Sequence, residues 1–249
     1  MVGLFIAALM GLVFGSFATM ASYRLVMEEP FVGRSQCPNC KTQLKVRSLV
    51  PVLSYVAQRG RCANCSEPIA LRYPLLELLT CAAFVGIAYA NITLYQAICL
   101  YIAALLLVIL IAVDIEALII PDTLQLGLML VGVYYAFLSG RGLLEVMGTA
   151  IFSFLLGCLL YYGSKIMIKK EGLGWGDVKF FAVAGLFLNI ELLAPFFFIS
   201  GIIGILTALI WKAYSTEPEF PFGPALAISL YVCTVWPAVT DLIPFMSPQ

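Results

Sequence analysis

Residues 94–113 read LYQAICLYIAALLLVILIAV, and Asp114 follows them directly. An uncharged run of about 20 residues has the length of a helix that crosses a bilayer. The composition agrees, because 62% of the residues are hydrophobic and only 11% are charged, whereas soluble domains are about 45–50% apolar and about 25% charged. The sequence therefore predicts a polytopic membrane protein.

Further apolar runs of similar length follow along the chain. Continuous runs indicate helices, since the strands of a membrane barrel alternate between apolar and polar residues. We predict an all-α protein with about eight transmembrane helices, among which the short run 178–193 gives the weakest signal. The first run is not preceded by basic residues, as a secretory signal peptide would be, and is interpreted as an uncleaved helix. The expected spans are 2–23, 75–91, 94–113, 123–139, 142–164, 178–193, 195–211 and 223–243.

The basic residues orient these spans. If the N-terminus lies outside and residues 24–74 lie inside, Arg141 alone among the 14 Lys and Arg residues falls outside. The positive-inside rule describes such a bias. Asp114 and Asp177 then both lie at the cytoplasmic boundary, a placement that follows from the basic residues alone.

The polar segment 24–74 contains two CxxC pairs, Cys37-Pro-Asn-Cys40 and Cys62-Ala-Asn-Cys65, with 21 residues between them. This spacing is typical of zinc ribbons, in which four thiolates surround one Zn²⁺ ion and leave no position for water. Disulfides are one alternative, but a cytosolic loop is reducing. A redox role is another, and it would need only one pair. We therefore predict a structural zinc site in a small cytoplasmic insertion after the first helix.

Two aspartates stand at the edges of apolar runs. Asp114 closes the run quoted above, and Asp177 lies in the segment Gly172-Leu-Gly-Trp-Gly-Asp-Val-Lys179, just before another run. A carboxylate at a bilayer boundary is costly to desolvate and suggests a functional site. Asp177 could instead be a first-turn acid that caps a helix. A capping role does not require the glycines before it, which let a backbone approach another helix or a substrate strand closely.

Two carboxylates within a few ångströms can hydrolyse a peptide bond. One takes a proton from water, and the other, protonated, hydrogen-bonds to the scissile carbonyl; they share a proton because two close like charges repel. Glu77, Glu116 and Asp122 compete with Asp114 for a functional role. An intervening helix would place Asp122 about 12 Å from Asp114 along its axis, so Asp177 is the predicted partner.

The chain contains no histidine. This excludes Ser-His-Asp and Cys-His catalysis and the usual His-ligated catalytic zinc. The predicted organisation is a first transmembrane helix, 1–23, a cytoplasmic loop with the zinc site, 24–74, and a membrane-embedded aspartyl protease core, 75–249. A protein of this kind acts on protein and lies in a bilayer, and nothing in the sequence indicates nucleic acid as a partner.

Taken in order along nearly the whole chain, these motifs resemble the type IV prepilin peptidases, a family of GxGD-type intramembrane aspartyl proteases that are also N-methyltransferases. Each motif alone is weak to moderate, whereas the ordered set is highly specific. The matching segments are Gly15-Ser-Phe17 with Arg24, the two CxxC pairs, Arg72-Tyr-Pro-Leu-Leu-Glu77, Val113-Asp-Ile-Glu116 with Ile120-Pro-Asp122, Gly172–Lys179 and Phe222-Gly-Pro224.

The resemblance implies that Asp114 and Asp177 are the catalytic pair and that Gly174, Gly176 and Lys179 belong to the active-site loop. It also implies type IV prepilins or pseudopilins of a pilus, type II secretion or competence system as substrates. Their basic leader would be removed after a glycine at the cytoplasmic face of a bacterial inner membrane. S-Adenosyl-L-methionine would then supply a methyl group to the new N-terminus.

One position departs from the family pattern, since Thr19 stands where asparagine is expected. Threonine lacks the paired donor and acceptor of an amide, so a peptidase without methyltransferase activity stays open. A membrane transporter or a non-catalytic scaffold with a zinc ribbon are further alternatives, although both aspartates lie at one boundary. The sequence does not locate the methyl-donor site, because it lacks a Gly-rich dinucleotide-binding fingerprint.

Overall fold

The computed structural model of the protein describes residues 1–90, 92–168, 173–215 and 219–238. Within these ranges the chain is all-helical, and its β-structure consists of two isolated bridges in the loop after the first helix. The chain forms two compact units, which we call unit 1 (Met1–Asn91) and unit 2 (Ile92–Gln249). The prediction of an all-α protein with an insertion after the first helix is confirmed.

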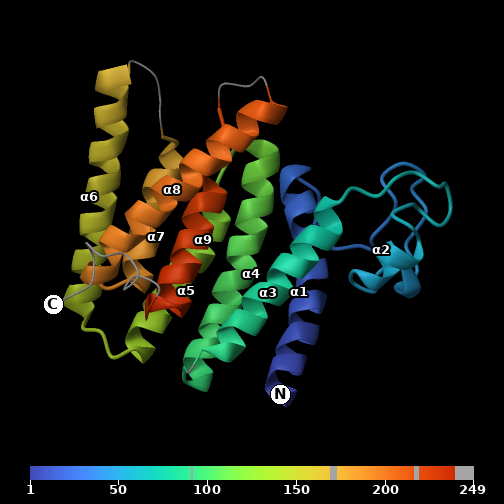
Figure 1. Ribbon diagram of the computed structural model, residues 1–249, viewed down its shortest axis with the longest axis horizontal. Coiled ribbons are helices and arrows are strands. Elements are labelled where there is room, and N and C mark those ends of the chain that lie inside the picture. Colours follow the sequence, from blue (N-terminus) through green and yellow to red (C-terminus); the bar gives the residue numbers. More distant parts are fainter. Residues whose placement is uncertain (91, 169–172, 216–218, 239–249) are drawn as a thin grey trace. The chain divides into compact units, whose positions relative to one another are not determined.

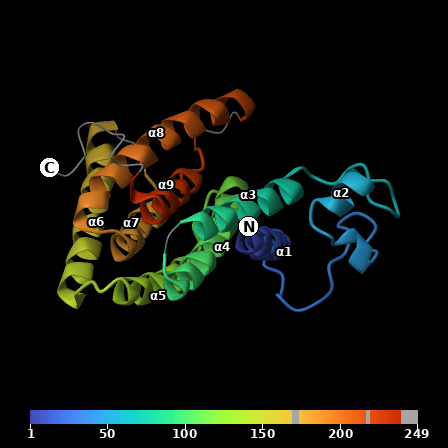
Figure 2. The ribbon, with the colours of Figure 1, turned by 60° about the horizontal axis from the view of Figure 1, so that its bottom comes forward.

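Unit 1 is built on two long helices that run side by side (Figures 1 and 2). Small residues allow this close packing, because a Cβ atom at Gly15 would lie 2.6 Å from the Cα atom of Glu77. The loop between the two helices carries one turn of 3-10 helix and one short helix. The elements are α1 (Val2–Val26), η1 (Val46–Ser48), α2 (Leu53–Ala57) and α3 (Arg72–Tyr89).

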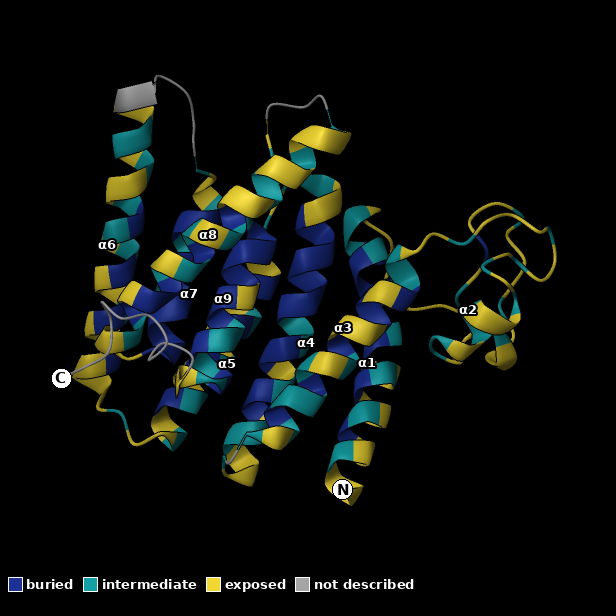
Figure 3. Ribbon diagram, in the orientation of Figure 1, coloured by how far each residue is buried: buried dark blue, intermediate teal, exposed yellow. Residues whose placement is uncertain are grey.

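Unit 2 consists of α4 (Leu94–Ala117), α5 (Asp122–Leu138), α6 (Leu143–Ile168), α7 (Trp175–Phe187), α8 (Ile190–Tyr214) and α9 (Gly223–Val235). The short helices α7 and α9 are mostly buried, as their dark colour in Figure 3 shows. The packing of α7 bears directly on the position of Asp177. It packs against α5 and α6. A Cβ atom at Gly185 would lie 2.6 Å from the Cα atom of Ala150, so α6 and α7 meet backbone to backbone. This packing fixes the position of α7 and of Asp177 on its first turn.

Eight helices correspond to the eight predicted spans. Four of them, α1, α4, α6 and α8, are long and apolar enough to cross a membrane by themselves, and α5 and α9 are shorter apolar helices. The protein is thus a multi-pass membrane protein.

One predicted boundary is wrong. The break between the sixth and seventh predicted spans lies at Leu188 and Asn189, not near residue 194. Asn189 occupies the N-cap position of α8, whereas Pro195 lies inside that helix and does not begin it. The predicted ends at Asn91 and 239–243, together with Lys169, Lys170 and Gly172, fall outside the described residues.

Candidate active site

The two predicted aspartates come together within unit 2. Asp114 lies in the last turn of α4, and Asp177 lies in the first turn of α7. Their side chains are buried, with Asp114 4% and Asp177 8% exposed. The carboxylates are close enough for the charge of Asp114 to act on Asp177. Burying two neighbouring acids costs free energy unless other groups of the fold form hydrogen bonds to them.

The N-terminus of α9 supplies part of this compensation for Asp114. The backbone N–H of Gly223 donates a hydrogen bond of 2.6 Å to Oδ2 of Asp114. A helix N-terminus also carries a partial positive charge, which attracts a carboxylate. Only glycine fits here, because a Cβ atom at residue 223 would lie 2.7 Å from the same oxygen.

Asp177 is held in a similar way at the start of its own helix. The backbone N–H of Gly174 donates a hydrogen bond of 2.9 Å to Oδ2 of Asp177. This contact alone is ordinary for an acid in the first turn of a helix. A capping acid, however, does not need to be 8% exposed or to lie within the electrostatic influence of a second buried carboxylate. Among the described residues no hydrogen bond reaches the Oδ1 atom of either aspartate, which leaves one oxygen of each for a ligand.

Gln125 of α5 ties the segment around Asp177 to the rest of unit 2. Its Nε2 atom donates to the carbonyl oxygen of Gly176 at 3.2 Å, and the side chain is 3% exposed. Gly176 in turn lies against Ile120, since an added Cβ atom would come within 3.2 Å of the Cβ atom of that residue. Sequence reasoning missed the roles of Gln125 and of the Gly223 N–H. The available signal for Gln125 was a side-chain amide within an apolar run.

The remaining predicted site residues lie nearby but differ in detail. Gly174 precedes α7, whereas Gly176 and Lys179 lie on the helix and not in a loop. Lys179 forms an ion pair of 2.6 Å with the exposed Asp122, the first residue of α5. Trp175 is 45% exposed and contacts the rings of two α6 residues edge-on. The partners of Trp175 are Phe154 and Tyr161.

The four predicted metal ligands form a cluster in unit 1. The sulfur atoms of Cys37, Cys40, Cys62 and Cys65 all lie within 4.8 Å of one another. The Sγ atoms of Cys37 and Cys65 are 3.9 Å apart, close to the edge of about 3.8 Å that a tetrahedron with Zn–S bonds of about 2.3 Å requires. All eight cysteines, each in the described part of the chain, are free thiols. The donor set and its spacing therefore fit a bound metal ion better than disulfides.

The two halves of the cluster are near copies of one turn. We call Ser35–Leu44 and Gly60–Ile69 the two knuckles. Antiparallel bridges close both, between Gln36 and Gln43 in the first and between Arg61 and Pro68 in the second. The knuckles also clasp each other: an asparagine of each donates a hydrogen bond to the other. These bonds run from Asn39 to Glu67 at 3.1 Å and from Asn64 to Thr42 at 3.0 Å.

The surroundings of Cys40 favour metal binding. Hydrogen bonds from the side chain and backbone of Thr42, and then from the side chain of Asn64, lower the pKa of the Cys40 thiol to about 6. These hydrogen bonds favour the thiolate form of Cys40, which is the form that coordinates metals.

The chain is similar to known proteins along most of its length. Residues 9–91 match the bacterial peptidase A24 N-terminal domain, and residues 99–209 match the type IV leader peptidase family. Three relatives named prepilin leader peptidase/N-methyltransferase come from Aeromonas hydrophila, Neisseria gonorrhoeae and Bacillus subtilis strain 168. They are 31%, 30% and 32% identical, over 85%, 94% and 87% of this chain and 75%, 92% and 88% of their own length. No solved structure shows a significant match.

Proposed function

The chain belongs to the type IV leader peptidase family, and from that premise we propose that it removes the leader of type IV prepilins or pseudopilins and then methylates the new N-terminus. The observation that carries the first activity is the buried pair of Asp114 and Asp177, each held by one glycine N–H. The proposed location is a bacterial inner membrane, with cleavage at the cytoplasmic face.

The geometry supports an acid–base mechanism. One carboxylate of the pair takes a proton from water, which attacks the scissile carbonyl, while the other carboxyl group hydrogen-bonds to the carbonyl oxygen. The acid then protonates the leaving nitrogen as the C–N bond breaks. Gly223 and Gly174 hold Oδ2 of each aspartate in place and leave Oδ1 for water and substrate. Lys179 and Asp122 form an exposed ion pair near the N-terminus of α7 and are not required in these steps.

The second activity uses S-adenosylmethionine, which when bound supplies a methyl group to an amine. Thr19 is the position that departs from the family pattern. Its side chain is 4% exposed, and its hydroxyl donates a hydrogen bond of 2.8 Å to the carbonyl oxygen of Ser16 in the same helix. The hydroxyl of Thr19 thus finds its hydrogen-bond acceptor within its own helix. The mass of the mature product shows whether methylation is retained.

The test is the reaction of the purified full chain, in detergent, with a prepilin of known sequence and S-adenosylmethionine. We expect a mature product shortened by its basic leader and heavier by one methyl group, as measured by mass spectrometry. A product of the unmethylated mass would confirm the peptidase and reject methylation. An uncleaved substrate, in a preparation whose thermal unfolding shows a folded protein, would overturn the proposal.

We further propose that the four clustered cysteines hold one structural Zn²⁺ ion. Four thiolates complete a tetrahedral site and leave no open position for catalysis. Replacing Cys62 with serine is expected to lower the zinc content from about one ion per chain to less than about a tenth of that, as measured by elemental mass spectrometry. Cys158→Ser is the matched control, because Cys158 lies in α6, outside the cluster.

Protease sensitivity gives the second readout for the same variants. Loss of the metal is expected to expose the loop 27–71 to a protease, because binding free energy in such sites is folding free energy. Cleavage of prepilin is expected to survive, since both aspartates lie in unit 2. Full zinc content in Cys62→Ser, or equal protease sensitivity in the two variants, would contradict the assignment.

A further inference from the structure

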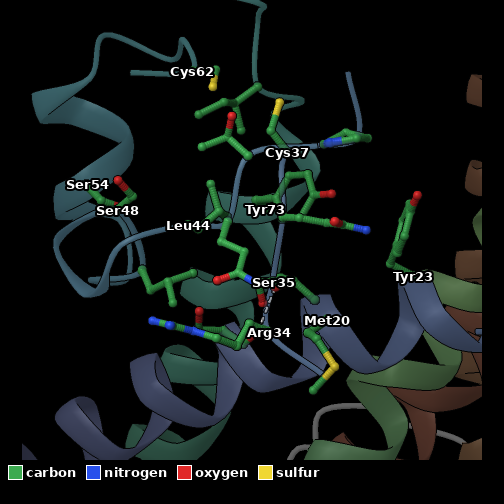
Figure 4. A pocket seen from close by; sticks show the side chains of 18 of the residues that line it. Met20, Tyr23, Arg34, Ser35, Cys37, Leu44, Ser48, Ser54, Cys62 and Tyr73 are labelled. Atoms are coloured by element: carbon green, nitrogen blue, oxygen red, sulfur yellow. Dashed lines mark hydrogen bonds between the residues drawn. The ribbon is translucent and has the colours of Figure 1, made fainter. Parts of the chain in front are cut away.

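Polar side chains are arranged differently in the two units. In unit 1 several of them line a cavity of about 780 Å³ between α1, α3 and the loop that carries the cysteines, and Figure 4 shows Ser48, Ser54 and Tyr73 around this common space. In unit 2 the side chain of Arg141 is 6% exposed and Thr149 is 4% exposed, and both lie against the end of one helix. Under the predicted orientation Arg141 is the one basic residue outside. A cation that only oriented a span could stay in water, so its burial points to another role.

The helix that these two residues contact, α7, is too short to cross a bilayer by itself. Its 13 residues rise about 20 Å, whereas the hydrocarbon core is about 30 Å thick. Its last residues are buried, with Leu186 7% and Phe187 4% exposed. The last four carbonyl groups of a helix have no partner within it, and an unpaired carbonyl is costly where water is absent. The C-terminus of α7 therefore needs hydrogen-bond donors from elsewhere in unit 2.

Arg141 and Thr149 supply these donors. The Nη1 atom of Arg141 donates to the carbonyl oxygen of Leu186 at 3.0 Å. The Oγ1 atom of Thr149 donates to the carbonyl oxygen of Gly185 at 2.7 Å, the shortest of its contacts with carbonyl oxygens. The Nη2 atom of Arg141 donates in turn to Oγ1 of Thr149 at 3.0 Å, and its positive charge suits the partial negative charge of a helix C-terminus. We call Arg141 and Thr149 the α7 clamp.

The α7 clamp holds the helix at the end opposite to Asp177. From Gly185 to Asp177 the helix rises about 12 Å, and a helix transmits a shift along its axis from one end to the other. Lipid tails are as apolar as the side chains, so close packing and hydrogen bonds between helices decide how they are arranged. The close approach of Gly185 to Ala150 sets the distance between α7 and α6. The hydrogen bonds of the clamp are directional and fit at one position along the axis.

We infer that Arg141 and Thr149 are positioning residues for peptide cleavage, which fix α7 along its axis and thereby hold Asp177 beside Asp114. The inference rests on the proposed peptidase activity. Both residues act through α7 and not on the substrate. A displacement of about 1 Å in an active site lowers a rate about 10²-fold, so a small slip of α7 reduces kcat. KM stays nearly constant, because the clamp makes no contact with the substrate.

The test compares two variants of Thr149 that each remove a different half of the side chain. Thr149→Val keeps the methyl group and the volume but removes the hydroxyl, whereas Thr149→Ser keeps the hydroxyl and removes the methyl group. The measurement is the initial rate of prepilin cleavage by the purified full chain at matched folded concentrations. We expect Thr149→Val to lower kcat at least about tenfold with KM within about twofold of wild type. Thr149→Ser should retain at least about half of the wild-type kcat. A residue that only fills space would give the reverse order.

Thr207→Val is the matched control for the loss of a hydroxyl group. Thr207 lies in α8, and its hydroxyl donates a hydrogen bond of 2.8 Å to the carbonyl oxygen of Ile203 within the same helix. We expect its rate to stay within about twofold of wild type. Equal rates in Thr149→Val and Thr207→Val would overturn the inference while the peptidase stands. A wild-type protein that cleaves no prepilin would instead overturn the proposed function.

Arg141→Lys separates the clamp from the orienting effect of a positive charge. Lysine keeps the charge on which topology depends. Its ammonium lacks the planar fork with which Arg141 reaches Leu186, Thr149 and, at 2.9 Å, Glu145. We expect kcat to fall at least about fivefold, because a point charge cannot replace a forked donor. A wild-type kcat in this variant would reject the role of Arg141.

Trp175 reports the position of α7 in the absence of any substrate. Its ring centroid lies 6.3 Å from that of Phe154 and 5.5 Å from that of Tyr161, both on α6. Along the axis of α7 it lies about 15 Å from Gly185. A slip of α7 against α6 therefore changes the surroundings of the indole ring, even though the clamp is at the other end of the helix.

The emission maximum of Trp175 is measured in a chain whose other two tryptophans, Trp211 and Trp236, are replaced by phenylalanine. We expect Thr149→Val to shift this maximum, whereas Thr149→Ser and Thr207→Val should keep it. An unchanged maximum in Thr149→Val would show that α7 keeps its place without the hydroxyl. That result would overturn the inference whether or not the protein cleaves a prepilin.

Discussion

Asp114→Asn and Asp177→Asn are each expected to lower the rate of prepilin cleavage about 10³-fold. Asparagine keeps the shape of the side chain and can still accept the hydrogen bonds from Gly223 and Gly174. It can neither take a proton from water nor share one with its partner. The measurement is the initial rate of leader removal with purified protein at matched folded concentrations.

The matched control for these variants is Glu191→Gln. Glu191 is an exposed acid in the first turn of α8, so its loss removes one charge at a helix N-terminus without touching the aspartate pair. We expect its cleavage rate to stay within about twofold of wild type, as for most surface substitutions. Wild-type rates in either aspartate variant would reject the catalytic assignment. A lowered melting temperature would assign the loss to folding.

Gly223→Ala is expected to lower the cleavage rate about 10²-fold, a loss comparable to that from a displacement of about 1 Å in an active site. The added methyl group would lie 2.7 Å from Oδ2 and 2.9 Å from Cγ of Asp114. The carboxylate or the start of α9 must therefore move, and the hydrogen bond from residue 223 is strained or lost. The chemical groups of both aspartates remain intact in this variant, so the prediction tests their geometry alone.

Gly201→Ala provides the comparison for Gly223→Ala. Gly201 lies in α8, and nothing lies within 4 Å of an added Cβ atom. Alanine there should be neutral or stabilise by about 0.5–1 kcal/mol, the usual advantage of alanine over glycine in a helix. If both variants cleave at the wild-type rate, the contact between Gly223 and Asp114 does not position the carboxylate.

Much of the fold was predictable because the relevant forces are local. Apolar runs specify helices by their length, and the eight predicted runs match eight helices. The reliance on apolar runs also explains the wrong boundary between α7 and α8. The extended backbone of Leu188 and Asn189 separates the two helices. The polar residues there, Asn189 and Glu191, are too few to interrupt the apolar run that surrounds them.

The acids and cysteines of the candidate site were predictable from the sequence, but the residues that hold the acids in place were not. Asp114 and Asp177 stand out because burying a charge at the edge of an apolar run costs free energy in any arrangement of the helices. The contact of Gly223 with Asp114 and that of Gln125 with Gly176 join residues far apart in sequence. Their pairing depends on how α4, α5, α7 and α9 pack, which no local pattern encodes.

The reciprocal clasp of the two knuckles makes their ordering a single event. Each supplies two sulfur atoms, and each gives an asparagine to the other, so neither is complete by itself. A half-formed loop has no stable place between the folded and unfolded forms. Removal of the metal ion would then unfold both knuckles in one step, while the aspartate pair, which lies in unit 2, keeps its place.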